Sequence, residues 1–415
     1  MNITRRIFVR QGALTVIGTA AIPAFLSRIA FSAESSSSGK KRMVVIFQRG
    51  AVDGLNVVIP HGESNYFSMR PTLAVPRQKI LDLDGFFGLH PSMAAFQPLW
   101  RSSQLAIVHA AGSPDNTRSH FDAQDYMESG TPGRKSTEDG WLNRVLATEA
   151  IRGQKESPFR AVAMGGHLPR ILSGTEPAVA IDNINNFGIA GRNAEAAPLA
   201  NTFESMYAES VDTVLHGTGS ETFDAVKMLK SADPQRYTPA NGANYPRGPL
   251  GQALRQTAQL IKADLGVEVA FADVGGWDTH VNQGGEQGQL ANRLSDFSQS
   301  IAAFWTDLGP LADSTVLVTM SEFGRTAREN GTRGTDHGHA NVMFVLGGPV
   351  KGGRVYGEWP GLAPEQLNEG RDLVLTTDFR RVLGEVVYRH LGSWQLERVF
   401  PGFENNVGYF LKLLG

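Results

Sequence analysis

Continuous apolar runs constrain the fold of this chain more than any other feature, because strands that are buried on both faces have this pattern. The runs are RMVVIF (42–47), LAIVHAA (105–111), VEVAFADV (267–274), TVLVTM (315–320) and NVMFVLGG (341–348). Helical patterns lie among them, at residues 91–100, 251–266, 292–309 and 376–392. This alternation predicts an α/β fold with a mostly parallel central sheet flanked by helices.

One long stretch departs from the pattern. Residues from about 167 to 244 lack clean buried strands and carry clusters of Gly, Asn and Ala. We interpret this stretch as a cap-like insertion in a single domain that spans residues 42–415, and not as an independent domain.

The first residues have the features of an export signal. Arg5 and Arg6 precede a weakly apolar stretch, and AFSA at residues 30–33 offers small residues for cleavage. This order of features predicts a twin-arginine signal over residues 1–33, with a flexible linker over 34–41. The twin-arginine translocase would then be a partner during export, and the mature protein would be periplasmic or secreted, without a stable membrane span. The alternative is an ordinary amphipathic first helix.

Composition narrows the chemistry. The chain has 415 residues, no cysteine, ten histidines and a formal net charge of −2. The absence of cysteine excludes thiolate metal sites and disulfides, so a metal would have to be held by His, Asp, Glu or other oxygen ligands. The small net charge gives no overall field that would attract nucleic acid.

Polar clusters stand next to most of the apolar runs. Each cluster alone has a simple explanation: Asp53 shaping a turn, Ser119 capping a helix, Asp278 bonding its own loop, His280 lying half-buried, or Glu322 pairing with Arg325. Their repetition is more informative, because parallel strands bring their carboxyl ends to one edge of a sheet. The residues that we select on this basis are Asp53, Arg118, Ser119, His120, Asp278, His280, Glu322, Arg325, His337 and His339.

The stretch GTDHGHAN (334–341) is the densest of these clusters. In an extended segment, residues i and i+2 point to the same side, so both His337 and His339 can face one ion. Carboxylates gathered at one sheet edge would repel one another without a cation. We therefore expect a site for one or two divalent ions (Zn, Mn, Mg or Ca), with Asp336 accepting an N–H from a ligating imidazole.

The assembled motifs resemble a secreted bacterial family catalogued as domain of unknown function 1501, which is grouped with the alkaline phosphatase and sulfatase superfamily. The resemblance covers nearly all of the mature chain. The motifs that carry it are FQRGAVDGLNVVIP, LHPSM, NTRSHFDAQDYMESG, GGWDTH, SEFGRT and GTDHGHAN.

The resemblance implies roles for several residues. Asp53-Gly54 matches the first metal-binding Asp-Gly pair of the superfamily, and Asp278 with His280 resembles the next ligands at a shorter spacing. Glu322-Phe323-Gly324 stands where the superfamily has Asp-His-Gly, so the second imidazole of GTDHGHAN is expected to replace the missing one. Counting back from Gly130 places His120, and not Ser or Thr, at the position of the nucleophile.

The motifs and the resemblance together support two functional interpretations. The first is a periplasmic metal-dependent hydrolase of phosphate or sulfate esters. Asp53, Asp278, His280, Glu322, His337 and His339 would hold metal; Ser119 or His120 would attack or orient the substrate; Arg118 or Arg325 would bind its anionic group. The second is a non-catalytic periplasmic binding or assembly protein that keeps a structural metal site, which the absent nucleophile favours.

Overall fold

The computed structural model describes residues 40–135, 137–148, 157–184, 228–229, 236–404 and 407–415. It also describes two short strands near the N-terminus, β1 (Arg6–Arg10) and β2 (Ala13–Ile17). Most of the predicted linker (34–39) and much of the predicted signal and cap, including residues 185–227, therefore lie outside the described residues. Within the described part, no helix is both long and apolar enough to cross a membrane.

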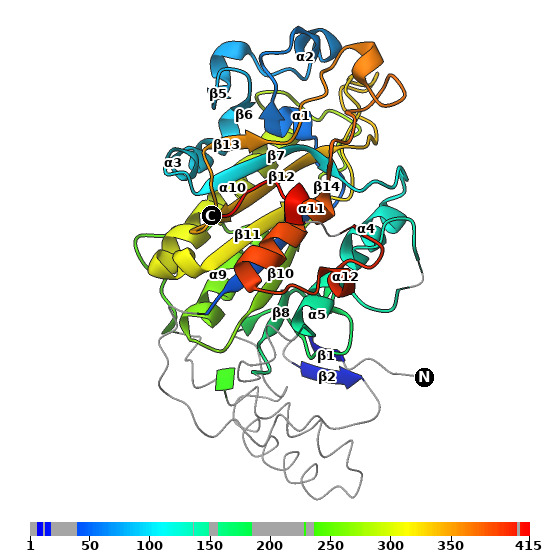
Figure 1. Cartoon of the computed structure of the whole chain (residues 1–415). Helices are drawn as coiled ribbons and strands as arrows, with labels where there is room; N and C mark the ends of the chain where they lie inside the picture. The colour runs from blue at the N-terminus through cyan, green and yellow to red at the C-terminus, as the bar shows by residue number, and fades with distance from the viewer. Residues whose placement is uncertain are drawn as a thin grey trace, which may run out of the picture.

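A single large sheet forms the centre of the molecule (Figure 1). Its strands follow the order β13-β7-β12-β11-β3-β10-β8-β9-β1-β2, and β14 pairs with β7. The strands after β2 are β3 (Arg42–Gln48), β7 (Leu105–Gly112), β8 (Ala161–Met164), β9 (Val179–Ile181), β10 (Val269–Val274), β11 (Thr315–Met320), β12 (Asn341–Gly347), β13 (Arg354–Tyr356) and β14 (Thr377–Asp378). All five predicted apolar runs are strands of this sheet, which confirms the predicted fold class.

The direction of β12 differs from that of the strands around it. Most neighbouring strands are parallel, including β3 with both β10 and β11. β12 instead runs antiparallel to both of its neighbours, β11 and β7. As a result, the residues that precede β12 lie at the same edge of the sheet as the residues that come after β3, β7, β10 and β11.

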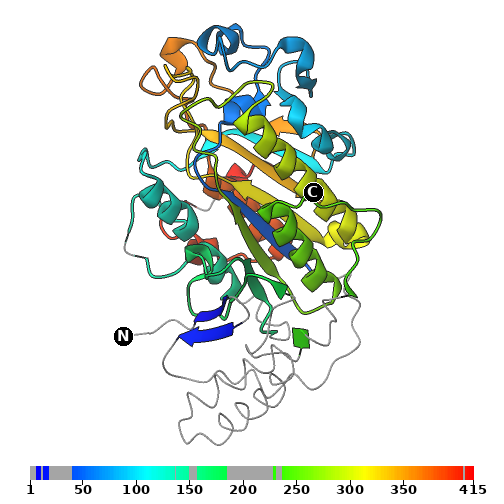
Figure 2. The same cartoon turned by 180° about the vertical axis from the view of Figure 1, so that it is seen from behind.

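Helices cover both faces of the sheet, as the two opposite views in Figures 1 and 2 show. Val44 and Ile46 of β3 join one apolar core, whereas Met43, Val45 and Phe47 join the other. This alternation results from the two-residue period of a strand. The first core is covered by α9 (Pro249–Lys262) and α10 (Gln289–Leu308), and the second by α5 (Trp141–Leu146), α11 (Phe379–Glu385) and α12 (Leu396–Val399).

The predicted helices are present, with local differences. The pattern at 91–100 forms a 3-10 helix, Pro91–Phe96, followed by α3 (Gln97–Arg101). The pattern at 376–392 begins as β14 and α11 and then continues as a π-helix, Val386–Leu391. Elements that the sequence did not indicate form one end of the molecule (Figure 1): α1 (Gly54–Val57), α2 (Ser64–Met69), and a small antiparallel sheet of β4 (Val58–Ile59), β6 (Gly88–Leu89) and β5 (Leu81–Asp82).

Candidate metal centre

Four loops meet at the carboxyl edge of the sheet. Three of them come after β3, β10 and β11, the fourth precedes β12, and α4 (His120–Ser129) begins beside them after β7. The approach is close at Gly50, which has φ +114°, and a Cβ there would lie 2.7 Å from the backbone nitrogen of Asp278. A side chain at position 50 would therefore push the Asp278 loop away from β3.

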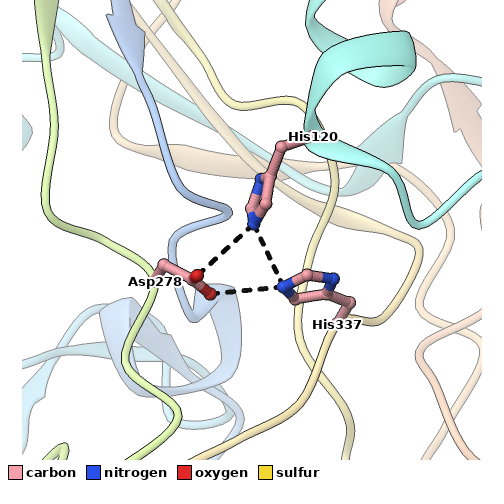
Figure 3. Close-up of side chains that lie close together, drawn as sticks. All are labelled: His120, Asp278 and His337. Atoms are coloured by element: carbon pink, nitrogen blue, oxygen red, sulfur yellow. Dashed lines mark hydrogen bonds and ion pairs between the residues drawn. The ribbon is translucent and has the colours of Figure 1, made fainter.

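Three side chains converge where these loops meet (Figure 3). The Nε2 atoms of His120 and His337 lie 3.0 Å apart. The carboxylate of Asp278 reaches both, with Oδ1 3.2 Å from His337 Nε2 and Oδ2 3.6 Å from His120 Nε2. The donor atoms of these three residues all lie within 4.8 Å of one another.

A third imidazole, His280, adjoins this set. Its Nε2 lies 3.0 Å from His337 Nε2 and 2.9 Å from Asp278 Oδ1. All three imidazoles therefore present the same nitrogen, Nε2, to one small region. Two nitrogens that share a tetrahedral ion at about 2.0–2.1 Å each would lie roughly 3.3 Å apart, close to the separations seen here.

Each of the three imidazoles also forms a hydrogen bond through its other nitrogen, Nδ1. His120 Nδ1 bonds to Glu322 Oε1 at 2.8 Å, and His280 Nδ1 bonds to Asp336 Oδ1 at 3.0 Å. His337 Nδ1 bonds to the main-chain oxygen of Arg118 at 2.9 Å. Because all three partners are acceptors, Nδ1 must donate in each case, and a neutral imidazole then turns the Nε2 lone pair toward the cluster.

This arrangement is the one expected of metal-binding histidines, whose second nitrogen usually donates to a carboxylate or carbonyl. Arg325 Nη1 lies 3.5 Å from His280 Nε2, but the lone pairs of His120 and His337 face each other at 3.0 Å and repel, so a proton or a cation has to lie between them. The donor set therefore fits a divalent ion held by His120, His337 and the carboxylate of Asp278, with His280 adjoining the site.

The pKa values of the cluster residues are shifted in different directions. The hydrogen bond from Glu322 raises the pKa of His120, whereas burial lowers the pKa of His337. Burial would raise the pKa of Asp278, but the charge and hydrogen bond of Arg325 outweigh it and lower that pKa overall. Asp278 is thus held as a carboxylate beside His120, whose imidazole is more disposed than that of His337 to carry a proton.

Glu322 supports the cluster through His120 without belonging to it, and His339 faces a partner outside it. Glu322 is buried, and its Oε1 accepts from Gly50 N, His120 Nδ1 and Gln124 Nε2, each at 2.8 Å. His339 Nε2 lies 3.0 Å from the main-chain oxygen of Ser113. The chain bends at His339, so the i, i+2 relationship of an extended segment does not apply, and only His337 reaches the cluster.

Asp53 belongs to a different group of buried charges. Its two carboxylate oxygens accept from Arg70 Nη1 and Nη2 at 2.7 and 2.9 Å, and Oδ2 also accepts from Gln283 Nε2 at 2.6 Å. Both Asp53 and Arg70 are fully buried. A two-point pair of this kind satisfies the carboxylate without an ion.

The residues proposed for substrate contact also have partners of their own. Ser119 caps α4, accepting from the backbone nitrogen of Asp122 at 3.5 Å. Arg325 is fully buried and donates to the main-chain oxygens of Gly50, Ala51, Trp277 and Thr335, and to Asp278 Oδ1 at 2.6 Å. It therefore joins three of the loops that form the site. Arg118 pairs with Glu369 and Asp372.

Sequence reasoning missed several contributors. Gln124 supports Glu322, Asn330 donates to Asp336 at 3.0 Å, and Arg371 donates to the main-chain oxygen of His337 at 2.7 Å. The pKa of Asp336 is lowered, first by the hydrogen bond from Asn330 and further by His280 and Arg371. None of these residues stands in a motif that the sequence marks, except Gln124, which lies one helical turn after His120.

The fold and the site define an α/β protein with a candidate His/Asp metal centre at the carboxyl edge of its sheet. The model of the family described as protein of unknown function (DUF1501) matches residues 40–397, and the chain belongs to that family. The comparison with curated proteins found no match.

Two solved structures show a distant likeness. One is Ps i-CgsB in complex with k-i-k-neocarrahexaose, with a TM-score of 0.36, 12% identity, and coverage of 85% of this chain and 72% of that one. The other is the lipoteichoic acid synthase LtaP from Listeria monocytogenes, with a TM-score of 0.31, 9% identity, and coverage of 79% and 68%. Likenesses this weak carry no argument about function.

Proposed function

We propose that this chain is a periplasmic, metal-dependent hydrolase of phosphate or sulfate esters. The observation that carries the proposal is the convergence of three Nε2 atoms on the carboxylate of Asp278, with each Nδ1 fixed by an acceptor. The imidazole-rich donor set favours Zn over Mg or Ca. Such an ion, when bound, stabilises negative charge that develops on an ester oxygen.

The chain's own residues prepare the site. Glu322, Asp336 and the main-chain oxygen of Arg118 fix the tautomers of the three imidazoles. Arg325 holds Asp278 Oδ1 at 2.6 Å, which leaves Oδ2 as the carboxylate oxygen without a hydrogen bond from that guanidinium. Phe323 packs against His120 and His337, with ring centroids 4.9 and 5.0 Å away, and keeps water from that side of the cluster.

The site remains accessible from solvent, as a substrate requires. The side chains of His120 and His337 are 24% and 23% exposed, and Asp278 is 43% exposed. A purely structural ion is usually enclosed by four protein ligands, whereas a catalytic one keeps a position open. Partial exposure of the ligands therefore supports a reactive centre.

A specific observation also supports the second candidate, a non-catalytic periplasmic binding or assembly protein with a structural ion. The first residue of α4, where the superfamily resemblance implies a nucleophile, is His120, and its imidazole belongs to the cluster. The adjacent hydroxyl, that of Ser119, is used as the helix cap. Neither side chain is left free to form a covalent intermediate.

Metal analysis combined with activity assays separates the two candidates. Protein purified from the periplasm of its native host would be analysed for metals and then assayed on chromogenic phosphate monoesters, phosphodiesters and sulfate esters with Zn, Mn, Mg or Ca. The hydrolase proposal expects turnover that is lost in His337→Gln together with the ion. A protein that holds a stoichiometric ion and cleaves none of these esters would favour the non-catalytic candidate.

Export by the twin-arginine route is part of the proposal. It is supported by the arginine pair at positions 5 and 6 and the weakly apolar stretch after it. On this interpretation residues 1–33 are removed and 34–41 form a linker. Of the stretch from about 167 to 244, β9 pairs with β8 in the central sheet, and the residues after β9 form the cap over the α/β domain.

A further inference from the structure

A hydrolase of phosphate or sulfate esters needs a cation for the oxygens of its substrate that do not react. Among the described residues, three arginines contact the candidate metal centre: Arg118, Arg325 and Arg371. Guanidinium groups bind tetrahedral oxyanions through two parallel hydrogen bonds, so a useful arginine must have donors that are both exposed and uncommitted.

Two of the three do not meet this requirement. The side chain of Arg325 is 0% exposed, and its Nε, Nη1 and Nη2 all donate to acceptors in the protein. Arg118 is 30% exposed, but its Nη2 lies 2.8 Å from Glu369 and 2.7 Å from Asp372, so its charge is matched by two carboxylates.

Arg371 meets the requirement for donors that are exposed and uncommitted. Its side chain is 38% exposed, and its closest carboxylate contact is 3.7 Å, from Nε to Asp372 Oδ1. Its hydrogen bond to a described residue runs from Nη2 to the main-chain oxygen of His337, at 2.7 Å. That bond places the guanidinium on the segment that carries the central imidazole of the cluster.

Two further contacts keep Arg371 in place. Its backbone nitrogen donates to Asn368 O at 3.0 Å, and its backbone oxygen accepts from Ala327 N at 2.9 Å. The backbone of the segment is therefore fixed to the loop after β11, while the guanidinium faces solvent beside Asp336 and His337. An arginine anchored in this way loses less conformational freedom on binding an anion than an arginine on a mobile loop.

We propose that Arg371 binds the non-bridging oxygens of a tetrahedral phosphate or sulfate group whose ester lies at the His120–Asp278–His337 cluster. The proposal rests on the proposed function, since it assigns the anionic substrate to the same site. It also moves the anion-binding role from Arg118 and Arg325 to a residue outside the motifs of the sequence.

The test measures anion binding directly. Inorganic phosphate and inorganic sulfate are titrated separately by calorimetry into Zn-loaded protein, comparing wild type with Arg371→Gln and Arg371→Lys. Arg328→Gln is the matched control, because it removes the same charge from an exposed position on the neighbouring loop. Zinc content and thermal unfolding of each variant are measured in parallel.

We expect Arg371→Gln to weaken binding of at least one anion roughly 10- to 100-fold, as for the loss of a charged hydrogen bond. Arg371→Lys should recover part of the loss, and Arg328→Gln should bind like wild type. The anion that shows the larger loss identifies the phosphate or the sulfate class. These results would support the proposal even if no ester is hydrolysed, in which case only the hydrolase function would fail.

Three results would overturn the proposal. The first is wild-type protein that binds neither anion, and the second is Arg371→Gln protein that binds both anions as tightly as wild type. The third is loss of zinc from Arg371→Gln, which would show that the residue only positions His337.

Discussion

The Nε2 atoms of His120 and His337 lie 3.0 Å apart although 217 residues separate them in the chain. Each ring donates from Nδ1 to a fixed acceptor, so neither Nε2 carries a proton in the neutral form. Such a contact is stable only with a cation between the rings or a proton on one of them. The folded chain therefore favours binding of a cation at this contact.

The first prediction concerns the identity of the metal ligands. His120→Gln and His337→Gln should lose the bound ion, because each removes an Nε2 donor from the cluster. His339→Gln is the matched control from the same stretch, and it should keep the ion because His339 faces Ser113. Metal content per chain, measured by mass spectrometry, checks this; retention of the ion in His337→Gln would contradict it.

The same ion should stabilise the fold. A ligand present at one hundred times its dissociation constant adds about 2.7 kcal/mol to the free energy of unfolding. Wild-type protein should therefore melt at a lower temperature after treatment with a chelator and recover when Zn is added. His337→Gln should show little response to either treatment.

The second prediction concerns Asp53 and Arg70, which form a buried two-point ion pair. Asp53→Ala leaves the guanidinium buried without its partner, which should cost about 3–5 kcal/mol of unfolding free energy. The double variant Asp53→Ala, Arg70→Met should recover a large part of that loss. Urea unfolding measures both variants, and equal stability of wild type and Asp53→Ala would refute the prediction.

Metal content of a further variant, Asp53→Asn, gives a second result. Because Asp53 faces Arg70 and Gln283, folded Asp53→Asn should keep the ion. Loss of the ion in a variant that keeps its fold would restore Asp53 as a ligand, as its Asp-Gly motif implies.

The third prediction concerns pH and the buried residue His109. Burial lowers the pKa of His109 to about 4 from an ordinary value of 6.5. Its Nε2 donates to Val58 O and its Nδ1 accepts from Ala110 N, both at 2.9 Å, so the folded state needs the neutral ring. Between pH 6.5 and 4 the unfolded chain binds a proton that the folded chain does not, so stability falls as pH falls.

The size of this effect can be measured. Between pH 7 and pH 5, His109 should account for a loss of about 2 kcal/mol in the free energy of unfolding. The variant His109→Gln, which has no proton to gain, should lose that much less over the same interval, although it is less stable at pH 7. Identical pH dependence in the two proteins would count against the prediction.

The fourth prediction concerns export. The paired arginines at positions 5 and 6 should be required by the twin-arginine translocase, which does not accept a lysine pair equally well. Replacing both by Lys should leave full-length precursor in the cytoplasm of a bacterial host, detected by cell fractionation. Normal processing and export of the Arg5→Lys, Arg6→Lys chain would exclude this route.

The sequence predicted the strands of the sheet and the polar residues at its carboxyl edge. The apolar runs at 315–320 and 341–348 correspond to β11 and β12 almost residue for residue, because strands buried on both faces need continuous apolar side chains. The same residues could not give the direction of β12. Strand direction depends on which neighbours it pairs with, and those pairings join segments far apart in the chain.

Local patterns were a weaker guide to individual side chains. His337 and His339 both stand shortly before β12 in sequence, yet the chain bends at His339 and the two side chains face different partners. Asp53 stands in a motif that resembles a metal-binding motif, but its carboxylate forms an ion pair with Arg70, which lies at the end of α2. Arg371 has no sequence signal at all, since its place beside His337 depends on tertiary packing.

The antiparallel direction of β12 also sets the order in which the metal centre can be completed. During synthesis the segment with His120 emerges first, the Asp278 loop comes second, and His337 comes last, just before β12 itself. His337 reaches the others only when β12 has entered between β7 and β11. A chain that has not yet added β12 therefore has only His120 and Asp278 to offer an ion, and the complete set of three ligands exists only after the sheet has closed.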